Sequence, residues 1–301
     1  MPGSPQLVLT VDRSGRGDHR RIQDAIDAAP ADTAGSSVVI RIKPGEYREK
    51  VVVGKPRITL VGTNAGSTVV TWNDSTVAAA SAASPSTVSV LASDFIAKRL
   101  TFQNTSGSSG PAVAVRVAGD RAAFYGCRFL SSQDTLLDDT GRHYYRGCYV
   151  EGRTDLICGN GKALFDKCHL HSTSPVGGAG AFTAHQRSSE SEDTGFSFVG
   201  CKLTGIGVAT SILGRPRGPC PRVVFALSYM SSTVRPEGWD DDDHDCGDDP
   251  AKRRAAFYGQ YQCYGEGSKT EGRVAWSRDL SQAEAAPFIT KVWVGGQEWL
   301  R

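Results

Sequence analysis

Residues 124–170 read FYGCRFLSSQDTLLDDTGRHYYRGCYVEGRTDLICGNGKALFDKCHL, and this stretch contains a structural repeat. An aromatic or apolar cluster leads into a cysteine three times, at Cys127, Cys148 and Cys168, which stand 21 and 20 residues apart. A fourth copy ends at Cys201, 33 residues further on. Self-similarity at a period of about 20 residues is typical of stacked units, none of which buries its apolar face alone.

Each repeat is rich in aromatic and β-branched residues, ends in Gly, Asn or Asp turns and shows little helical periodicity. The pattern predicts an all-β fold, a single-stranded parallel β-helix with short helices near both ends. An amphipathic helix over Arg20–Ala29 is expected to cap the N-terminal end, and a capping box at Ser281–Glu284 predicts a helix ending near Phe288. Strands are expected at 7–11, 38–42, 51–53, 58–61, 68–70, 88–90, 100–105 and 223–229.

The chain shows no linker that would divide it, so we expect a single domain over residues 1–301 with its core at about 7–300. The small, polar segment 75–87 is expected to be a loop. Residues 240–249 hold seven aspartates, and a solvated acidic loop is a better interpretation than a calcium site.

Composition and charge indicate a soluble globular protein, with 39% hydrophobic and 22% charged residues. The net charge of +2 is too small to indicate nucleic-acid binding, although it suits an anionic polymer substrate. No apolar run is long enough to span a bilayer, and residues 1–5 carry no export signal. We expect no nucleic-acid partner, no membrane contact and no cofactor, and a capped solenoid that is a monomer.

Four of the eight cysteines recur at one place in the repeat, so we expect them to stack inward as small core residues rather than to form disulfides. The sequence leaves Cys158, Cys220, Cys246 and Cys263 undecided. Zinc binding is not expected, because no CxxC spacing is present. Of the histidines, His169 and His171 could share one face of a strand as half of a metal site, and His185 is interpreted as structural.

Two carboxylates follow the period of the repeat, because Asp134 and Asp155 are 21 residues apart. In a parallel solenoid, equivalent positions on adjacent coils lie about 4.8 Å apart, so these two side chains should project together. A nearby Arg215 would favour the ionised form of one carboxyl, and repulsion would keep the proton on the other. Two aspartates on neighbouring coils can divide catalytic work if their environments push their pKa values apart.

The ordered motifs at 45–49 (GEYRE), 102–105 (FQNT), 133–136 (QDTL), 155–159 (DLICG) and 213–216 (LGRP) resemble those of plant pectin methylesterases. The resemblance covers about residues 7–300. It implies a right-handed parallel β-helix that removes methyl esters from homogalacturonan, releasing methanol. It also implies a cell-wall or extracellular location, and plant members of this family are known to bind a proteinaceous inhibitor.

The resemblance further assigns roles to individual residues. Asp155 is the expected nucleophile, Asp134 the general acid and base, and Arg215 the group that orients Asp155. Two glutamines, Gln103 and Gln133, match the family's donors to the oxyanion. We expect Arg217, Thr71 and Cys158 to contact substrate.

The sequence departs from the family pattern at aromatic positions. Arg217 stands where the family carries tryptophan, and Leu156 and Cys158 stand where it carries phenylalanines that line the sugar-binding cleft. These changes predict weakened or redirected binding. A catalytically weak or inactive homologue that binds pectin is therefore one alternative. A pectate lyase or polygalacturonase is another, but it would need a calcium cluster or acids flanking a glycosidic bond.

Overall fold

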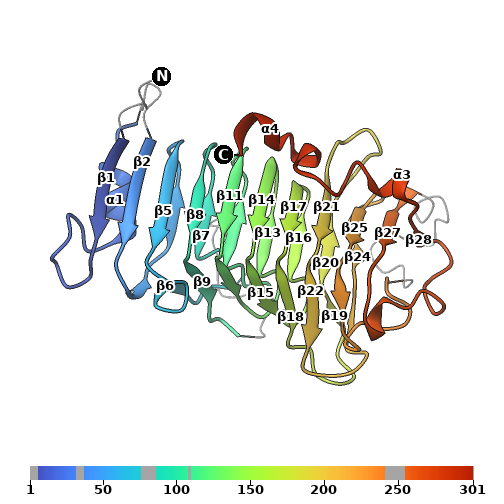
Figure 1. Cartoon of the computed structure of the whole chain (residues 1–301). Coiled ribbons are helices and arrows are strands. Elements are labelled where there is room, and N and C mark those ends of the chain that lie inside the picture. The colour runs from blue at the N-terminus through green and yellow to red at the C-terminus, as the bar shows by residue number, and fades with distance from the viewer. Residues whose placement is uncertain (1–5, 32–36, 76–85, 108–109, 241–254, 301) are drawn as a thin grey trace.

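The computed structural model describes residues 6–31, 37–75, 86–107, 110–240 and 255–300. Its strands wind into a parallel β-helix whose sheets run along one axis (Figure 1), as the repeat predicts. In the described residues the strands form three long sheets, named A, B and C, and one short pair.

The sheets are built from strands that return at each coil. Sheet A contains β1 (Gln6–Val11), β2 (Ser37–Ile42), β5 (Ile58–Gly62), β8 (Ile96–Lys98), β11 (Ala122–Tyr125), β14 (Arg142–Arg146), β17 (Lys162–Asp166), β21 (Gly195–Val199), β25 (Arg222–Ala226), β27 (Phe257–Tyr261) and β28 (Arg278–Asp279). Sheet B contains β3 (Gly45–Arg48), β6 (Thr68–Trp72), β9 (Thr101–Asn104), β12 (Arg128–Leu130), β15 (Tyr149–Gly152), β18 (His169–Ser172), β22 (Lys202–Gly205) and β26 (Tyr229–Met230). Sheet C contains β4 (Val51–Val53), β7 (Val88–Val90), β10 (Val115–Val117), β13 (Leu136–Asp138), β16 (Ile157–Gly159), β20 (Thr183–His185) and β24 (Arg215–Pro216), and β19 (Gly180–Ala181) pairs with β23 (Ser211–Ile212).

The corner between sheets A and B is a short left-handed turn. Gly126, Gly147 and Gly200 take positive φ angles of 58°, 58° and 62° there, which costs glycine nothing. At the same corner of other coils stand Lys167 (φ 54°) and Leu227 (φ 53°). The turn at Leu227 splits the strand predicted over 223–229 into β25 and β26. That prediction was wrong because leucine rarely marks such a turn.

The cysteine after this corner points into the core, as predicted. The thiols of Cys148, Cys168 and Cys201 donate to carbonyls of the preceding coil at 3.5, 3.4 and 3.3 Å. Cys263 makes the equivalent bond to Phe225 at 3.3 Å and so joins the ladder. The seven cysteines of the described residues are all free thiols, and Cys246 lies outside those residues.

Aromatic rings on sheet A form a stack along the solenoid axis. The centroids of Phe124, Tyr145, Phe165, Phe198 and Phe225 follow one another at 5.0, 4.5, 4.6 and 4.5 Å, and the rings lie nearly parallel. This spacing is close to the inter-strand distance of about 4.8 Å, so strand pairing holds the rings in van der Waals contact.

Short helices cover the ends and one flank of the solenoid. Helix α1 (Ile22–Ala28) buries Ile22, Ala25 and Ile26. Its first two N–H groups donate to the carboxylate of Glu49 at 2.8 and 3.1 Å. The capping box forms as predicted and opens α3 (Gln282–Ala285), which ends three residues before Phe288. The remaining helices of the described residues are two 3₁₀ turns, Glu266–Ser268 and Lys291–Val294, and α4 (Gly296–Trp299).

Two predicted loops fall mostly outside the described residues, namely 76–85 of the segment 75–87 and 241–249 of the acidic segment. Among the described residues, no helix has the length and apolarity needed to cross a membrane.

The ring stack should carry much of the stability of the central coils. We predict that Phe165→Ala lowers the free energy of unfolding by about 3–5 kcal/mol, because Phe165 contacts rings on both neighbouring coils and the cavity cannot close. Urea denaturation would measure this loss. Val176→Ala is the control, since Val176 is 83% exposed and should change stability by less than about 0.5 kcal/mol. Equal effects of the two changes would contradict the prediction.

Candidate active site

The two aspartates predicted to act together lie on adjacent coils. Asp134 follows β12 and Asp155 follows β15, where sheet B passes into sheet C. Gln133 pairs with Thr154 in a parallel bridge, and the N–H of Asp134 donates to the Thr154 carbonyl at 3.4 Å. The backbone register thus confirms the juxtaposition that the 21-residue spacing predicted.

Both aspartates occupy a left-handed backbone conformation. The φ angle is 55° at Asp134 and 49° at Asp155. Aspartate tolerates this region better than most residues, but the conformation still costs free energy and persists only where the surroundings enforce it. Its repetition at two neighbouring coils turns both side chains the same way at the corner.

Asp155 is a fully buried carboxylate held by two arginines. Its side chain is 0% exposed. Arg215, 60 residues later on β24, donates through Nε to Oδ1 at 2.7 Å and through Nη2 to Oδ2. Arg217 donates to the same Oδ2 at 3.1 Å. The bidentate contact fixes the plane of the carboxylate, and two guanidinium groups offset its charge where water does not reach it.

Asp134 lies in a different electrostatic environment. Burial is the main reason that its pKa rises to about 6, and repulsion by Asp155 raises it further. Arg217, Arg215 and a hydrogen bond with Cys158 act in the opposite direction but do not cancel these effects. Asp134 therefore stays mostly protonated up to a pH of about 6, where an ordinary aspartate has already lost its proton, and it can donate this proton.

Of the two predicted oxyanion donors, Gln133 lies at the same corner and Gln103 lies on a strand of sheet B in the preceding coil. Gln103 is on β9, where Thr71 of β6 and Leu130 of β12 pair with it on either side. Gln133 directly precedes Asp134, and both glutamine side chains are partly exposed. They come from neighbouring coils on the N-terminal side of Asp155.

The predicted substrate contacts differ in how accessible they are. Arg217 is about one-third exposed, whereas Thr71 is 3% and Cys158 is 4% exposed. Burial raises the pKa of the Cys158 thiol well above its ordinary value, so it stays protonated. Leu156 is 0% exposed and packs in the main hydrophobic core. It therefore does not line a cleft, contrary to what the family's aromatic pattern suggested.

Sequence reasoning missed the contact between Arg217 and Asp155. No spacing rule joins residues 62 positions apart, and Arg217 had been assigned to substrate alone. The parallel pairing of β20 with β24 aligns Ala184 with Arg215, which brings the segment containing both arginines beside the coil of Asp155.

The histidines singled out in the sequence, His169, His171 and His185, have other partners in the structure. His185 is buried, and its Nδ1 accepts the N–H of Arg222 at 3.1 Å. Burial is the main cause that lowers its pKa to about 3, so it is neutral. His169 and His171 do share a strand face, where both bind Thr204. In the part of the chain that the structure describes, no three His, Cys, Asp or Glu side chains are grouped as a metal site.

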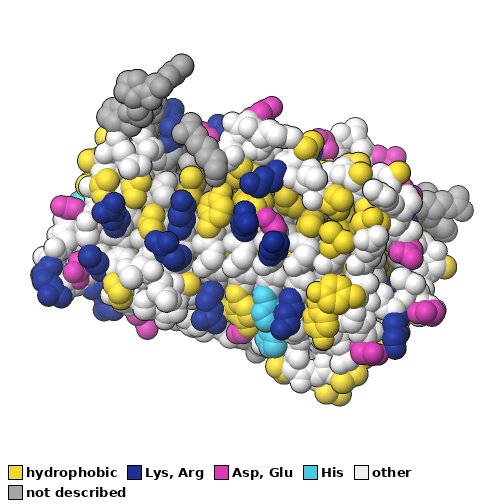
Figure 2. Space-filling view, in the orientation of Figure 1, with side chains coloured by type: hydrophobic (Ala, Val, Ile, Leu, Met, Phe, Trp, Pro, Cys, Tyr) yellow, Lys and Arg dark blue, Asp and Glu magenta, His cyan; other side chains and the backbone are white. Residues whose placement is uncertain are grey.

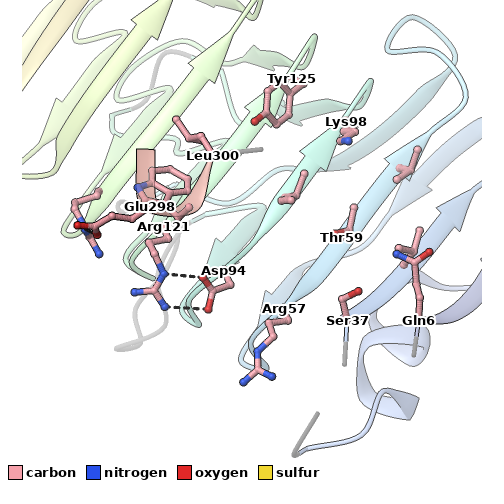
Figure 3. Close-up of a pocket in the computed structure, with 16 residues that line it drawn as sticks. Gln6, Ser37, Arg57, Thr59, Asp94, Lys98, Arg121, Tyr125, Glu298 and Leu300 are labelled. Carbon is pink, nitrogen blue, oxygen red and sulfur yellow. Dashed lines mark hydrogen bonds and ion pairs between the residues drawn. The ribbon is translucent and has the colours of Figure 1, made fainter. Parts of the chain in front are cut away.

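A separate groove of about 1020 Å³ lies on the outer face of sheet A, beside α4 (Figure 3). Its floor includes Thr59 and Ile96, and Leu300 forms part of its wall. The carboxylate of Asp94 receives two hydrogen bonds from Arg121 at 2.7 and 2.9 Å. This groove is formed by a different sheet from those that meet at Asp134 and Asp155.

Comparison with known proteins gives consistent matches. A family model described as Pectinesterase matches residues 8–297. Putative pectinesterase 11 of Arabidopsis thaliana is 48% identical, over 99% of this chain and 82% of that protein. Pectinesterase QRT1 of the same plant is 41% identical, over 98% and 79%. The structure of pectin methylesterase from carrot superposes with a TM-score of 0.90 at 30% identity, covering 97% of this chain and 94% of that one.

The raised pKa of Asp134 makes stability depend on pH. Between its ordinary pKa of 3.8 and about 6, the folded protein binds more protons at this group than the unfolded chain does. Stability contributed by the neutral carboxyl is therefore lost as pH rises through this window. We predict that Asp134→Asn raises the melting temperature at pH 7.5, and that the gain shrinks towards pH 4.

Thermal unfolding of both proteins at the two pH values checks this prediction. Asp279→Asn, which removes an exposed carboxylate, is the matched control and should show no such pH-dependent gain. If Asp134→Asn raised the melting temperature equally at pH 4 and pH 7.5, the raised pKa assigned to Asp134 would be contradicted.

Proposed function

This chain belongs to the pectinesterase family, and we propose that it removes methyl esters from homogalacturonan with Asp155 as nucleophile and Asp134 as general acid and base. The observation that carries the proposal is the unequal pair of carboxyls. One is buried and paired with two arginines, and its neighbour has a pKa of about 6. Pectin is a cell-wall polymer, so we further propose that the chain acts at the cell wall.

The first half of the reaction forms an acyl-enzyme. An oxygen of the Asp155 carboxylate attacks the ester carbonyl carbon, and the carbonyl π electrons move to oxygen. When this tetrahedral intermediate collapses, the bond to the methoxy oxygen breaks, and Asp134 gives its proton to the departing oxygen. The products of this step are methanol and a mixed anhydride between Asp155 and the galacturonate.

The second half returns the enzyme to its starting state. Asp134, now a carboxylate, takes a proton from water as the water oxygen attacks the galacturonate carbonyl of the anhydride. The bond to Asp155 breaks, which restores the Asp155 carboxylate with its arginine partners and frees the sugar as its carboxylic acid. This acid then loses the second proton of the water molecule to solvent and becomes the product carboxylate. Asp134 ends the cycle protonated, as the first step requires.

Gln103 and Gln133 are proposed to donate hydrogen bonds to the oxyanion formed in each half. They are neutral amides, so they can stabilise the developing negative charge by hydrogen bonds without transferring a proton to it. The loss of one such donor typically costs about 10²–10³ in rate.

Arg217 is proposed to have two roles. Its guanidinium already contacts Asp155, and its exposed part can meet a galacturonate carboxylate next to the ester being cleaved. Thr71 and Cys158 are proposed to shape the same site from its floor, because both are almost completely buried.

Removing the nucleophile tests the proposal. We predict that Asp155→Asn lowers methanol release from highly esterified pectin by about 10³-fold or more, because an amide cannot form the acyl-enzyme. Asp279→Asn should retain the wild-type rate. Near-normal release from Asp155→Asn would refute the assignment. No release from a wild-type chain that still binds pectin would show that only binding has been kept.

The acid role of Asp134 predicts a pH–rate profile. Its proton is needed to start each cycle, so kcat/KM should fall as pH rises through about 6. Initial rates of methanol release between pH 4.5 and 8.5 would measure this. A kcat/KM that stays constant across this range would mean that the first step uses Asp134 as a carboxylate instead.

A further inference from the structure

The outer face of sheet B carries a row of basic and aromatic side chains in register. Each residue of the row pairs with the next one on the neighbouring strand. In order, the row is Arg128 of β12, Tyr149 of β15, His169 of β18, Lys202 of β22 and Tyr229 of β26. In Figure 2 the histidine side chains lie in the lower half of the visible face, between basic and hydrophobic side chains. Five strands at about 4.8 Å spacing make the row about 19 Å long. We call this row the sheet B row.

Contacts inside the row hold its side chains in place. The Arg128 guanidinium lies 5.1 Å from the centroid of the Tyr149 ring, and the edge of His169 meets Tyr149 at 5.1 Å. His169 Nε2 and His171 Nδ1 lie 2.8 and 2.7 Å from the hydroxyl of Thr204. A ligand would meet rings that are already ordered, so little side-chain entropy is lost on binding.

The positive charges of the row have no carboxylate partner among the described residues. Neither Arg128 nor Lys202 forms an ion pair with any residue that the structure describes. Glu151 is the acid beside the row, and the Tyr149 hydroxyl donates to its Oε2 at 2.6 Å. Burial, then Lys202 and His171, lower the pKa of His169, so the fixed charge comes from Arg128 and Lys202.

We propose that the sheet B row is a second binding site, outside the catalytic corner, for a strand of de-esterified galacturonan. Arg128 and Lys202 would bind its carboxylates, and the rings of Tyr149 and Tyr229 would contact the apolar faces of its sugars. A polyuronate fits because it supplies negative charge and flat apolar faces along one line, as the row supplies their complements. This inference rests on the proposed function for the source of the ligand.

The site would act through effective concentration. Sheet B ends at the corner that holds Gln133 and Asp134, so one polymer can reach both the row and this corner. A chain held on the row by its de-esterified part keeps its esterified part near Asp155, which makes the second encounter intramolecular. The row should therefore matter for long, partly esterified polymers and not for short ones.

The test compares the wild type with the double variant Arg128→Gln/Lys202→Gln by affinity electrophoresis in gels containing fully de-esterified polygalacturonate. We expect the apparent Kd of the double variant to rise at least about fivefold, and that of Tyr149→Ala to rise as well. The control Arg41→Gln/Lys43→Gln removes the same charge from exposed positions near β2 and should bind as the wild type does. Melting temperatures establish that all variants are folded.

Several outcomes would overturn the proposal. They are wild-type binding by the double variant, an equal loss in the control, equally strong binding of polyglutamate, or a change of oligomeric state that assigns this face to a second copy of the chain. Methanol release from a short esterified oligogalacturonide is measured in parallel and should be the same in the double variant. The two proposals can fail separately. If the wild type released no methanol, yet bound polygalacturonate more tightly than the double variant did, the site would stand and the proposed activity would fail.

Discussion

Backbone pairing between successive coils is the constraint on which the rest of this structure depends. Each coil lies about one strand spacing from the next, so residues about 20 positions apart become neighbours. The same register stacks Tyr145 on Phe165, places the Cys168 thiol under the carbonyl of Tyr145, and sets Asp134 beside Asp155. Core packing and the candidate site are thus two results of one geometry, and a slip of one residue would destroy both.

The site differs from the core in that its geometry is costly. Two aspartates take left-handed backbone angles, and Asp155 places a charge where no water reaches it. Arg215, anchored two coils later in sheet C, makes this tolerable by a bidentate contact. Burial, and after it the charge of Asp155, raises the pKa of Asp134. Different surroundings therefore distinguish two chemically identical groups, and this difference is what the proposed roles of nucleophile and acid require.

Much of this could be predicted from the sequence because it follows from periodicity. The repeat predicted the parallel β-helix and the inward cysteines, and the shared spacing predicted the aspartate pair. Features without a period were missed. The bond from Arg217 to Asp155 joins residues 62 positions apart, and the corner at Leu227 uses a residue that seldom adopts positive φ. Leu156 was placed by analogy with an aromatic lining, whereas it packs in the core.

A direct titration of the Asp134 carboxyl tests the central claim, that neighbouring carboxyls hold different protonation states. Carbon-13 labelling of the aspartates and comparison of the wild type with Asp134→Asn would identify the resonance. The account predicts a carboxyl that titrates near pH 6 in the wild type and is missing from the variant. An Asp134 resonance that titrates near its ordinary pKa of 3.8 would contradict it, because no proton would then be available for the departing methanol.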